Sequence, residues 1–301
     1  MEFITKETAD DLDLIRRILV AEGFDKLEKI TRLQSGSRSV AYYADKYIVR
    51  FPKDEIIWHS MQREKVIIDT VYSSLMPDFK GKIQKIELIE GTHPFSVSKR
   101  IDGKICDGRP ESEYATLYQN LNAEQQKSLA QSIAVFFNLM HRIDYKTLKI
   151  PALREELSAW DVTTRDDFDY ALVRQMLLDN SKGKIDLASY LVDKPNNELA
   201  FCHNDLAGSN LLINPAKDDV LQGIIDFANA DIVPKYFDFF SLYKIDCKLA
   251  HDTLTFYNKL TSSKIAQEQI DYLALTYIGY GFYKTKDSPS PYFMKLIKPF
   301  L

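Results

Sequence analysis

In the first hundred positions, segments with apolar residues at helical spacing are interspersed with short runs that are typical of β-strands. A short helix is predicted over Thr8–Ala21, because its apolar residues recur at helical spacing and Gly23 then ends the pattern. A second, longer helical pattern covers Asp54–Leu75. The remaining runs are rich in β-branched and aromatic residues and are separated by turn-forming residues. They predict about five strands: Leu27–Leu33, Val40–Ala44, Tyr47–Phe51, Ile83–Leu88 and Phe95–Lys99.

Helical periodicity takes over from about residue 103, most clearly over Ala123–Arg142, which carries a single apolar stripe. Three short apolar segments with polar flanks predict strands among these helices: Glu198–Cys202, Leu211–Ile213 and Leu221–Ile225. A strand-rich segment followed by a mainly helical one is an α+β plan. We therefore expect a bilobal chain, with a small β-rich lobe over residues 1–101 and a larger, mainly helical lobe over residues 102–301.

Composition narrows the class of protein. The chain has 301 residues, of which 45% are hydrophobic and 27% charged, and its net charge is −4. A mildly acidic chain lacks the excess positive charge that binding to nucleic acid or to an anionic membrane requires. The sequence opens without a basic and apolar leader and has no long uncharged apolar run, so we expect a cytoplasmic protein. The three cysteines have no CxxC spacing, which argues against a disulfide framework and a thiolate zinc site.

The segment Phe201–Leu212 contains His-x-Asp followed, after four residues, by Asn. This is the pattern of a phosphoryl-transfer catalytic loop, in which a carboxylate faces the acceptor hydroxyl and an amide oxygen binds the metal on the nucleotide phosphates. Asp205 is therefore the candidate catalytic base, and Asn210 is a candidate magnesium ligand. His203 is expected to hold the loop by hydrogen bonds.

A second motif, Ile225-Asp226-Phe227, places an aspartate at the end of an apolar strand, 21 residues after Asp205. This is the position of the magnesium-binding Asp-Phe-Gly of kinases. Because Mg²⁺ neutralises much of the charge on the transferring phosphates, Asp226 is the second candidate metal ligand. A strand-end aspartate that only caps a turn is the structural alternative.

The predicted helix Asp54–Leu75 carries one carboxylate, Glu64, on an otherwise apolar face. Glu64 has no cation at helical spacing and so needs a partner from elsewhere. The strand Tyr47–Phe51 offers Arg50, where kinases place a lysine that pairs with a helix glutamate and holds the nucleotide phosphates. We expect Arg50 and Glu64 to form this pair, since Lys53 would point to the other face of a continuing strand. A half-buried, solvated Glu64 is the alternative.

Two further segments are candidates for nucleotide contacts. Ser35, Gly36 and Ser37 join two predicted strands, where backbone N–H groups can cover phosphates, although an ordinary polar hairpin loop fits equally well. A connector between the two lobes would offer backbone groups to a nucleotide base, and Ser98, Arg100 and Ile101 fall at that position.

Together these motifs resemble the aminoglycoside phosphotransferase family, and most closely its 2″-phosphotransferase branch. The resemblance extends from about residue 30 to residue 245 and includes Met140-His141 at a helix end and Asp238, which matches a structural aspartate of the family. It implies a protein-kinase-like fold, with nucleotide bound by residues 1–101 and the catalytic loop and acceptor held by residues 102–301. It also implies transfer of the γ-phosphate of ATP or GTP, with Mg²⁺, to a hydroxyl of an aminoglycoside antibiotic, an antibiotic-resistance activity.

Three departures from the family pattern stand out. Arg50 replaces the usual lysine, and Asp231–Pro234 replaces the usual glycine-aspartate-proline. After Asp238 this branch carries acidic residues for its polycationic antibiotics, whereas Ser241–Lys248 holds one acid and two lysines. Other small acceptors therefore stay open, namely a macrolide, choline or a homoserine-like alcohol. Five aromatic residues are either core or the lining of such a pocket: Tyr272, Tyr277, Tyr280, Phe282 and Tyr283.

A protein kinase is disfavoured, because only twelve residues separate Asp226 from Asp238, too few for an activation segment with Ala-Pro-Glu. A catalytically silent nucleotide-binding homologue is the other alternative, although binding alone would not need the base Asp205. We expect Mg²⁺, ATP or GTP, and a small, cationic, hydroxylated acceptor as partners of a monomer or weak dimer, with no nucleic acid and no membrane.

Overall fold

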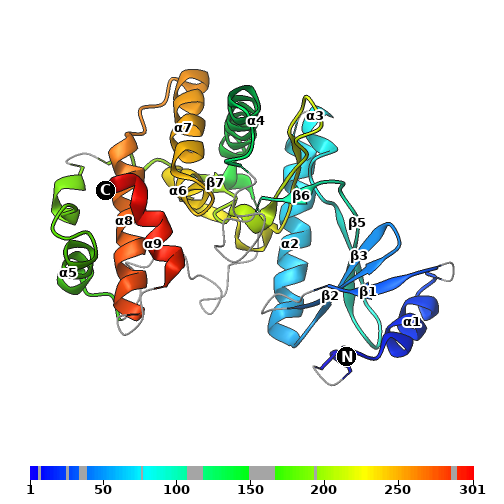
Figure 1. Ribbon diagram of the computed structural model, residues 1–301. Coiled ribbons are helices and arrows are strands. Elements are labelled where there is room, and N and C mark those ends of the chain that lie inside the picture. Colours follow the sequence, from blue (N-terminus) through cyan, green and yellow to red (C-terminus); the bar gives the residue numbers. More distant parts are fainter. Residues whose placement is uncertain are drawn as a thin grey trace. The chain divides into compact units, whose positions relative to one another are not determined.

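The computed structural model in Figure 1 describes residues 1–5, 8–24, 27–33, 39–75, 77–106, 118–148, 167–192, 195–285 and 290–301. The chain divides into two compact units. The first contains Met1–Ile101 together with Asp226–Ala228, and the second contains most of the chain after Asp102. The first is rich in strands and the second in helices, so the predicted α+β class is confirmed.

A five-stranded antiparallel sheet of order β1-β2-β3-β5-β4 forms the first unit. Alternate residues of β2 are buried, which places one face of the sheet on the core. In the tight turn between β2 and β3, Asp45 adopts a left-handed φ of 52°. The strands are β1 (Ile30–Arg32), β2 (Ser39–Ala44), β3 (Tyr47–Pro52), β4 (Ile86–Ile89) and β5 (Phe95–Lys99).

Three helices complete this unit: α1 (Leu12–Ala21), α2 (Glu55–Ser74) and α3 (Pro77–Lys80). Helix α1 begins at Leu12 and not at Thr8 as predicted, because the Asp11 side chain caps it by accepting the N–H of Leu14. Its buried residues join the sheet in one apolar core. Helix α2 packs against β3 and β4 and carries residues of the candidate site.

The second unit is built from helices. Helix α4 packs against α7, α5 against α8, and α6 against both α7 and α8 (Figure 1). A capping box between Asn122 and Gln125 begins α4 at the predicted position. The helices are α4 (Ala123–His141), α5 (Tyr170–Asn180), α6 (Tyr236–Tyr243), α7 (Cys247–Thr261), α8 (Gln267–Lys284) and α9 (Pro291–Ile297).

Two small antiparallel sheets lie in the second unit. Strand β7 (Leu199–Cys202) pairs with β10 (Asp231–Pro234), and β8 (Leu211–Ile213) lies between β6 (Lys104–Ile105) and β9 (Leu221–Ile224). Strands β7, β8 and β9 were predicted, whereas β6 and β10 were not. Short 3₁₀ turns connect the elements: η2 (Tyr145–Thr147), η5 (Leu187–Tyr190), η6 (Gly208–Asn210), η7 (Phe227–Asn229) and η8 (Lys298–Phe300).

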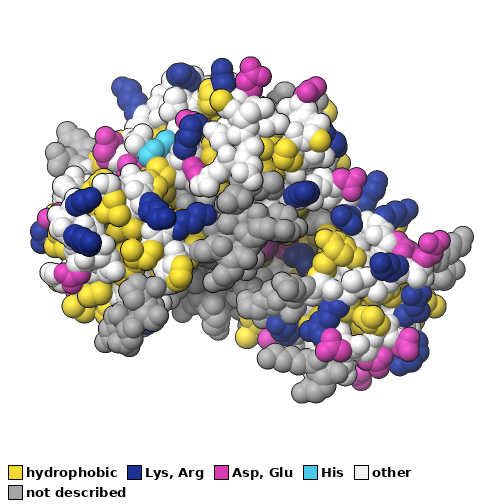
Figure 2. Space-filling model, viewed as in Figure 1, with side chains coloured by type: hydrophobic (Ala, Val, Ile, Leu, Met, Phe, Trp, Pro, Cys, Tyr) yellow, Lys and Arg dark blue, Asp and Glu magenta, His cyan; other side chains and the backbone are white. Residues whose placement is uncertain are grey.

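The aromatic residues of α8 belong mainly to the core. Tyr280 and Phe282 are buried in an apolar cluster that also contains residues of α5 and α9, and Tyr272, Tyr277 and Tyr283 pack against it. On the surface shown in Figure 2, acidic and basic side chains are interspersed. Among the described helices, none has the length and apolar character needed to cross a membrane.

Candidate active site

The candidate base Asp205 lies in the loop that connects β7 to η6. Its side chain is 11% exposed, and the carboxylate accepts a hydrogen bond from Asn229 Nδ2, which is 3.0 Å from Oδ2. The preceding residue, Asn204, has a left-handed φ of 62°, a conformation that asparagine tolerates better than most residues. The loop thus presents a buried but accessible carboxylate in a defined orientation.

Asp238 of α6 anchors this loop through its backbone. Oδ1 accepts the N–H of Asn204 at 2.7 Å, and Oδ2 accepts the N–H of His203 at 3.3 Å. The ring of His203 adds two bonds, one to the carbonyl of Ile225 at 3.2 Å and one from the N–H of Asp205 at 3.4 Å. These contacts agree with the expected hydrogen-bonding role of His203.

His141, Cys202 and Asp238 bring three potential metal-ligand atoms within 4.8 Å of one another. Hydrogen bonds account for this buried group, because His141 Nε2 lies 2.9 Å from Asp238 Oδ2 and Nδ1 lies 2.8 Å from the Tyr257 hydroxyl. Burial raises the pKa of the Cys202 thiol well above its ordinary value, which keeps it protonated. In the described structure, this cluster therefore supports the loop that carries Asp205 through the hydrogen bonds of Asp238.

Asn210 ends η6, and its side chain is oriented by the loop. Its amide Nδ2 donates to the carbonyl of Asp205 at 2.8 Å, which leaves the amide oxygen, Oδ1, as the atom able to bind a cation. The backbone carbonyl of Asn210 accepts the N–H of Ile225 at 3.1 Å, just before Asp226 in the chain.

Within the first unit, α2 holds the segment Asp226–Ala228. Arg63 is 4% exposed and donates to the carbonyl of Ala228 at 2.8 Å, and Glu64 accepts the backbone N–H of Phe227. Asp226 has a left-handed φ of 62° and a partly exposed side chain. Non-glycine residues rarely adopt this conformation without surrounding contacts, and these bonds supply them.

Arg50 and Glu64 form the predicted ion pair, with Arg50 Nη2 2.6 Å from Glu64 Oε2. Arg50 Nε also lies 3.3 Å from the hydroxyl of Ser96. Burial opposes the charged guanidinium, but Glu64 and Asp226 outweigh it and raise the pKa of Arg50. Burial raises the pKa of Glu64, Arg50 counteracts this effect, and Asp226 adds to it. A guanidinium can donate to carboxylate and phosphate oxygens at once, and the nearby Asp226 carboxylate favours a phosphate that arrives with its metal cation.

The other predicted nucleotide contacts are placed unevenly. Ser35, Gly36 and Ser37 lie outside the described residues. Ser98 is paired on both sides within β5, so its backbone groups belong to the sheet. The N–H of Arg100 donates to the carbonyl of Lys46 at 2.8 Å, and its guanidinium lies 4.9 Å from the centre of the Tyr43 ring. Ile101 is partly exposed, and a nucleotide role for these three residues remains a prediction.

Lys244 is a site residue that sequence reasoning missed. Its ammonium is 3.6 Å from Asp205 Oδ1, its side chain is 7% exposed, and it lies 5.6 and 5.7 Å from the ring centres of Phe240 and Tyr277. Burial lowers the pKa of Lys244 to about 8, although Asp205 opposes the shift. Its position one residue after α6 was visible in the sequence, but the contact with Asp205 depends on how α6 packs.

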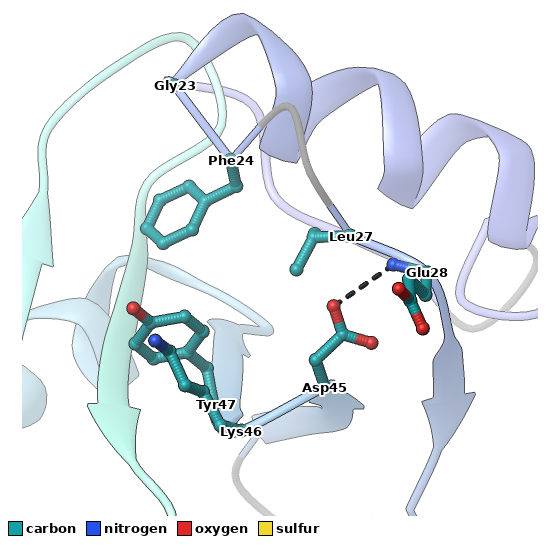
Figure 3. Close-up of a pocket in the computed structure, with 7 residues that line it drawn as sticks. All are labelled: Gly23, Phe24, Leu27, Glu28, Asp45, Lys46 and Tyr47. Carbon is teal, nitrogen blue, oxygen red and sulfur yellow. Dashed lines mark hydrogen bonds between the residues drawn. The ribbon is translucent and has the colours of Figure 1, made fainter.

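A separate hollow of about 490 Å³ lies on the first unit and is drawn in Figure 3. Asp45 points toward Glu28 there and accepts the N–H groups of Lys29 and Glu28 at 2.9 and 3.0 Å, which lower its pKa. Among the described residues, none that was predicted to bind nucleotide, metal or acceptor lines this hollow, so we do not assign it to the candidate active site. Its lining is Gly23, Phe24, Leu27, Glu28, Asp45, Lys46 and Tyr47.

Comparison with known proteins decides the family. Residues 29–263 match the phosphotransferase enzyme family. The chain belongs to this family. The match covers the Arg50–Glu64 pair, the loop from His203 to Asn210, and Asp226. It confirms the family resemblance and the prediction that the protein is an enzyme.

Solved structures of two phosphotransferases share the fold. One is the GDP complex of an aminoglycoside 2′-phosphotransferase, with a TM-score of 0.67 and 16% identity over 97% of this chain and 98% of that one. The other is a macrolide 2′-phosphotransferase, with a TM-score of 0.62 and 13% identity over 100% and 99% of the two chains. These likenesses confirm the predicted kinase-like fold.

One curated relative matches the chain at low sequence identity. Probable choline kinase 1 of Arabidopsis thaliana is 21% identical over 232 residues, which cover 76% of this chain and 64% of the relative. The chain therefore spans less than two thirds of the length of that relative.

Proposed function

We propose that this phosphotransferase transfers the γ-phosphate of ATP or GTP to a hydroxyl of a small molecule in an Mg²⁺-dependent reaction. The observation that carries the proposal is the loop from His203 to Asn210. Asp238 fixes its backbone, and the loop presents the Asp205 carboxylate and the Asn210 amide oxygen from one rigid segment. This is the combination that in-line phosphoryl transfer requires.

In the proposed mechanism, Asp205 orients the acceptor hydroxyl and accepts its proton. Arg50, held by Glu64, positions the phosphates. Asn210 and Asp226 offer an amide and a carboxylate oxygen, the ligand types that Mg²⁺ prefers, so the residues fit this cation. When bound, Mg²⁺ would neutralise part of the negative charge on the phosphates.

An aminoglycoside is the first candidate acceptor, supported by the motifs of the 2″-phosphotransferase branch and by the likeness to the aminoglycoside phosphotransferase structure. Lys244 favours a second candidate. Its ammonium already occupies one side of the Asp205 carboxylate and repels further cations. An acceptor with at most one positive charge, such as a macrolide or choline, is therefore the alternative.

The nucleotide preference and the location of the reaction are parts of the same proposal. Either ATP or GTP is the donor, and the aminoglycoside phosphotransferase with the similar fold was solved with GDP. The described structure has free thiols at Cys106, Cys202 and Cys247, as expected for a reducing cytoplasm. We propose that the enzyme acts there as a monomer or weak dimer.

The test is nucleotide turnover with Mg²⁺, measured with ATP and GTP against kanamycin, a macrolide, choline and homoserine, in wild type and Asp205→Ala. Stimulation by kanamycin that is lost in Asp205→Ala supports the aminoglycoside acceptor. Stimulation only by another compound keeps the reaction and replaces the acceptor. Turnover that is equal in both proteins with every acceptor contradicts the catalytic role of Asp205.

Asp226 is tested separately through the metal. We expect Asp226→Ala to abolish transfer even at saturating Mg²⁺, because the carboxylate is a proposed ligand. Asp231→Ala is the matched control, since this aspartate follows closely in the chain and has no proposed metal role. Substantial residual transfer in Asp226→Ala removes Asp226 from the metal site.

A further inference from the structure

A cluster outside the candidate active site brings together a thiol, an imidazole, a carboxylate and a phenol. Cys247 is the first residue of α7, and His251 lies one turn later on the same helix. Asp271 reaches them from α8, and Tyr243 from the last turn of α6. Helix α6 packs against both α7 and α8, so residues distant in sequence meet at one place (Figure 1).

The imidazole of His251 lies between the thiol and the carboxylate. Cys247 Sγ is 3.7 Å from Nδ1, and Asp271 Oδ1 is 2.8 Å from Nε2. The Tyr243 hydroxyl lies 2.6 Å from Nε2 and 3.6 Å from Sγ, and it donates to Asp271. The order thiol, imidazole, carboxylate is the one that activates a cysteine nucleophile.

Electrostatics favours the charged form of this imidazole. Burial lowers the pKa of His251, but the hydrogen bond with Asp271 and the contact with Cys247 outweigh burial and raise the pKa to about 9. A protonated imidazole beside the sulfur stabilises a thiolate, and the N-terminus of α7 adds its positive end.

Accessibility separates this cysteine from the other two. Cys106 and Cys202 are fully buried, whereas Cys247 is partly exposed and the side chain of His251 is 23% exposed. A small reagent in solvent therefore has access to Cys247.

We propose that Cys247 is a reactive thiol and a site of covalent modification, activated by His251 with Asp271 as the positioning residue. With a peroxide, the Cys247 thiolate attacks one peroxide oxygen and the O–O bond breaks. The sulfur becomes sulfenic acid, a two-electron oxidation, and the other oxygen leaves as hydroxide, which takes up a proton to form water.

Other groups around the cluster have their own partners in the described structure. Asp246 caps α7 by accepting the N–H of Lys248, and the Lys248 ammonium pairs with Asp252. Gln267 lies 3.5 Å from the second oxygen of Asp271. Among the described groups around the thiol, we therefore assign the activating role to His251, with Asp271 and Tyr243 as its hydrogen-bond partners.

The experiment measures alkylation by iodoacetamide at each cysteine of the folded protein, resolved by mass spectrometry between pH 5.5 and pH 9. We expect Cys247 to react roughly ten times faster than a free cysteine peptide at pH 6.5, while Cys106 and Cys202 stay unlabelled and report an intact fold. In His251→Gln the rate at pH 6.5 falls about tenfold and the pH profile shifts upward. Asp271→Asn, which keeps the shape, shifts the profile in the same direction.

A second arm treats the protein with hydrogen peroxide and traps sulfenic acid with dimedone, for which we expect an adduct at Cys247 and none in Cys247→Ser. The proposal is overturned if Cys247 reacts no faster than the peptide. It is also overturned if His251→Gln leaves the pH profile unchanged, or if no adduct forms. These readouts do not depend on the phosphotransferase reaction.

Discussion

Arg50 and Glu64 form a partly buried ion pair, and we propose that it contributes both to stability and to nucleotide binding. The Glu64 side chain is 3% exposed and that of Arg50 is 22% exposed, so the carboxylate depends on the guanidinium much more than the reverse. Arginine presents several donors in one plane, which lets Arg50 contact Glu64 and Ser96 together. A lysine at this position would have a single ammonium group for the contacts with both Glu64 and Ser96.

We predict that Arg50→Gln lowers the free energy of unfolding by about 3 kcal/mol, because a buried carboxylate loses its charge partner. The double variant Arg50→Gln with Glu64→Gln should regain more than half of this loss, although both proteins bind nucleotide at least tenfold more weakly. Urea unfolding and nucleotide titration check these outcomes. Equal stability of the single variant and wild type would show that Glu64 is solvated.

Lys244 predicts a pH dependence of stability. Its pKa is about 8 in the folded chain and 10.5 ordinarily, so between these values the unfolded chain holds more protons. Deprotonation of Lys244 therefore makes the free energy of unfolding rise with pH, by up to about 3 kcal/mol from pH 8 to pH 10.5. Lys244→Met should lack this rise in urea unfolding curves, whereas Lys248→Met, at an exposed lysine, should keep it. Parallel curves for Lys244→Met and wild type would contradict the shift.

Among the elements, α2 connects the sheet of the first unit to the segment that carries Asp226. Two adjacent residues do this, since Arg63 binds the carbonyl of Ala228 and Glu64 accepts the N–H of Phe227. The orientation of Asp226, with its left-handed backbone, thus depends on a helix about 160 residues earlier in the chain.

We predict that Arg63→Ala weakens Mg²⁺-nucleotide binding about tenfold and lowers the free energy of unfolding by about 2 kcal/mol, because a buried charged hydrogen bond is lost. Arg17→Ala removes an exposed arginine of α1 and is the control. Calorimetric titration and thermal unfolding measure the two effects. A variant that binds as wild type does would exclude α2 from positioning Asp226.

Most elements were predictable because their periodicity is strong. Helix α4 follows its apolar stripe and its capping residues, and β2, β3 and β5 follow their β-branched and aromatic runs. The pattern failed at β10, where Asp231–Pro234 has no alternation and becomes a strand only by pairing with β7. It also failed at the start of α1, where local capping by Asp11 outweighed the apolar period.

In the candidate site, the sequence predicted contacts between residues that belong to recognisable motifs, such as Arg50 and Glu64. Glu64 was recognised as a carboxylate on an apolar face, and Arg50 was the nearest strand cation. The contacts of Lys244 and Arg63 were missed, because each is made with a distant part of the chain. Lys244 stood out only as one of two lysines after Asp238. Tertiary packing alone brings such residues to the site.

At the scale of the whole molecule, the net charge is only −4, and acidic and basic side chains are interspersed among the described residues on the face shown in Figure 2. A small net charge gives only weak long-range attraction for a polycation. We therefore expect selectivity for the acceptor to depend on local groups, and in the described structure Lys244 places a cation 3.6 Å from Asp205. Membership of the phosphotransferase enzyme family sets the reaction class. We propose that the groups around Asp205 distinguish among the acceptors.

The most direct test of the account compares Mg²⁺-nucleotide affinity and acceptor-dependent turnover in the same preparations of wild type and Asp205→Asn. We predict nucleotide affinities equal within about threefold, and turnover at least about a hundredfold lower in Asp205→Asn, because only proton acceptance and hydroxyl orientation are lost. Turnover within a few-fold of wild type, at equal nucleotide affinity, would contradict the role of Asp205 as the catalytic base.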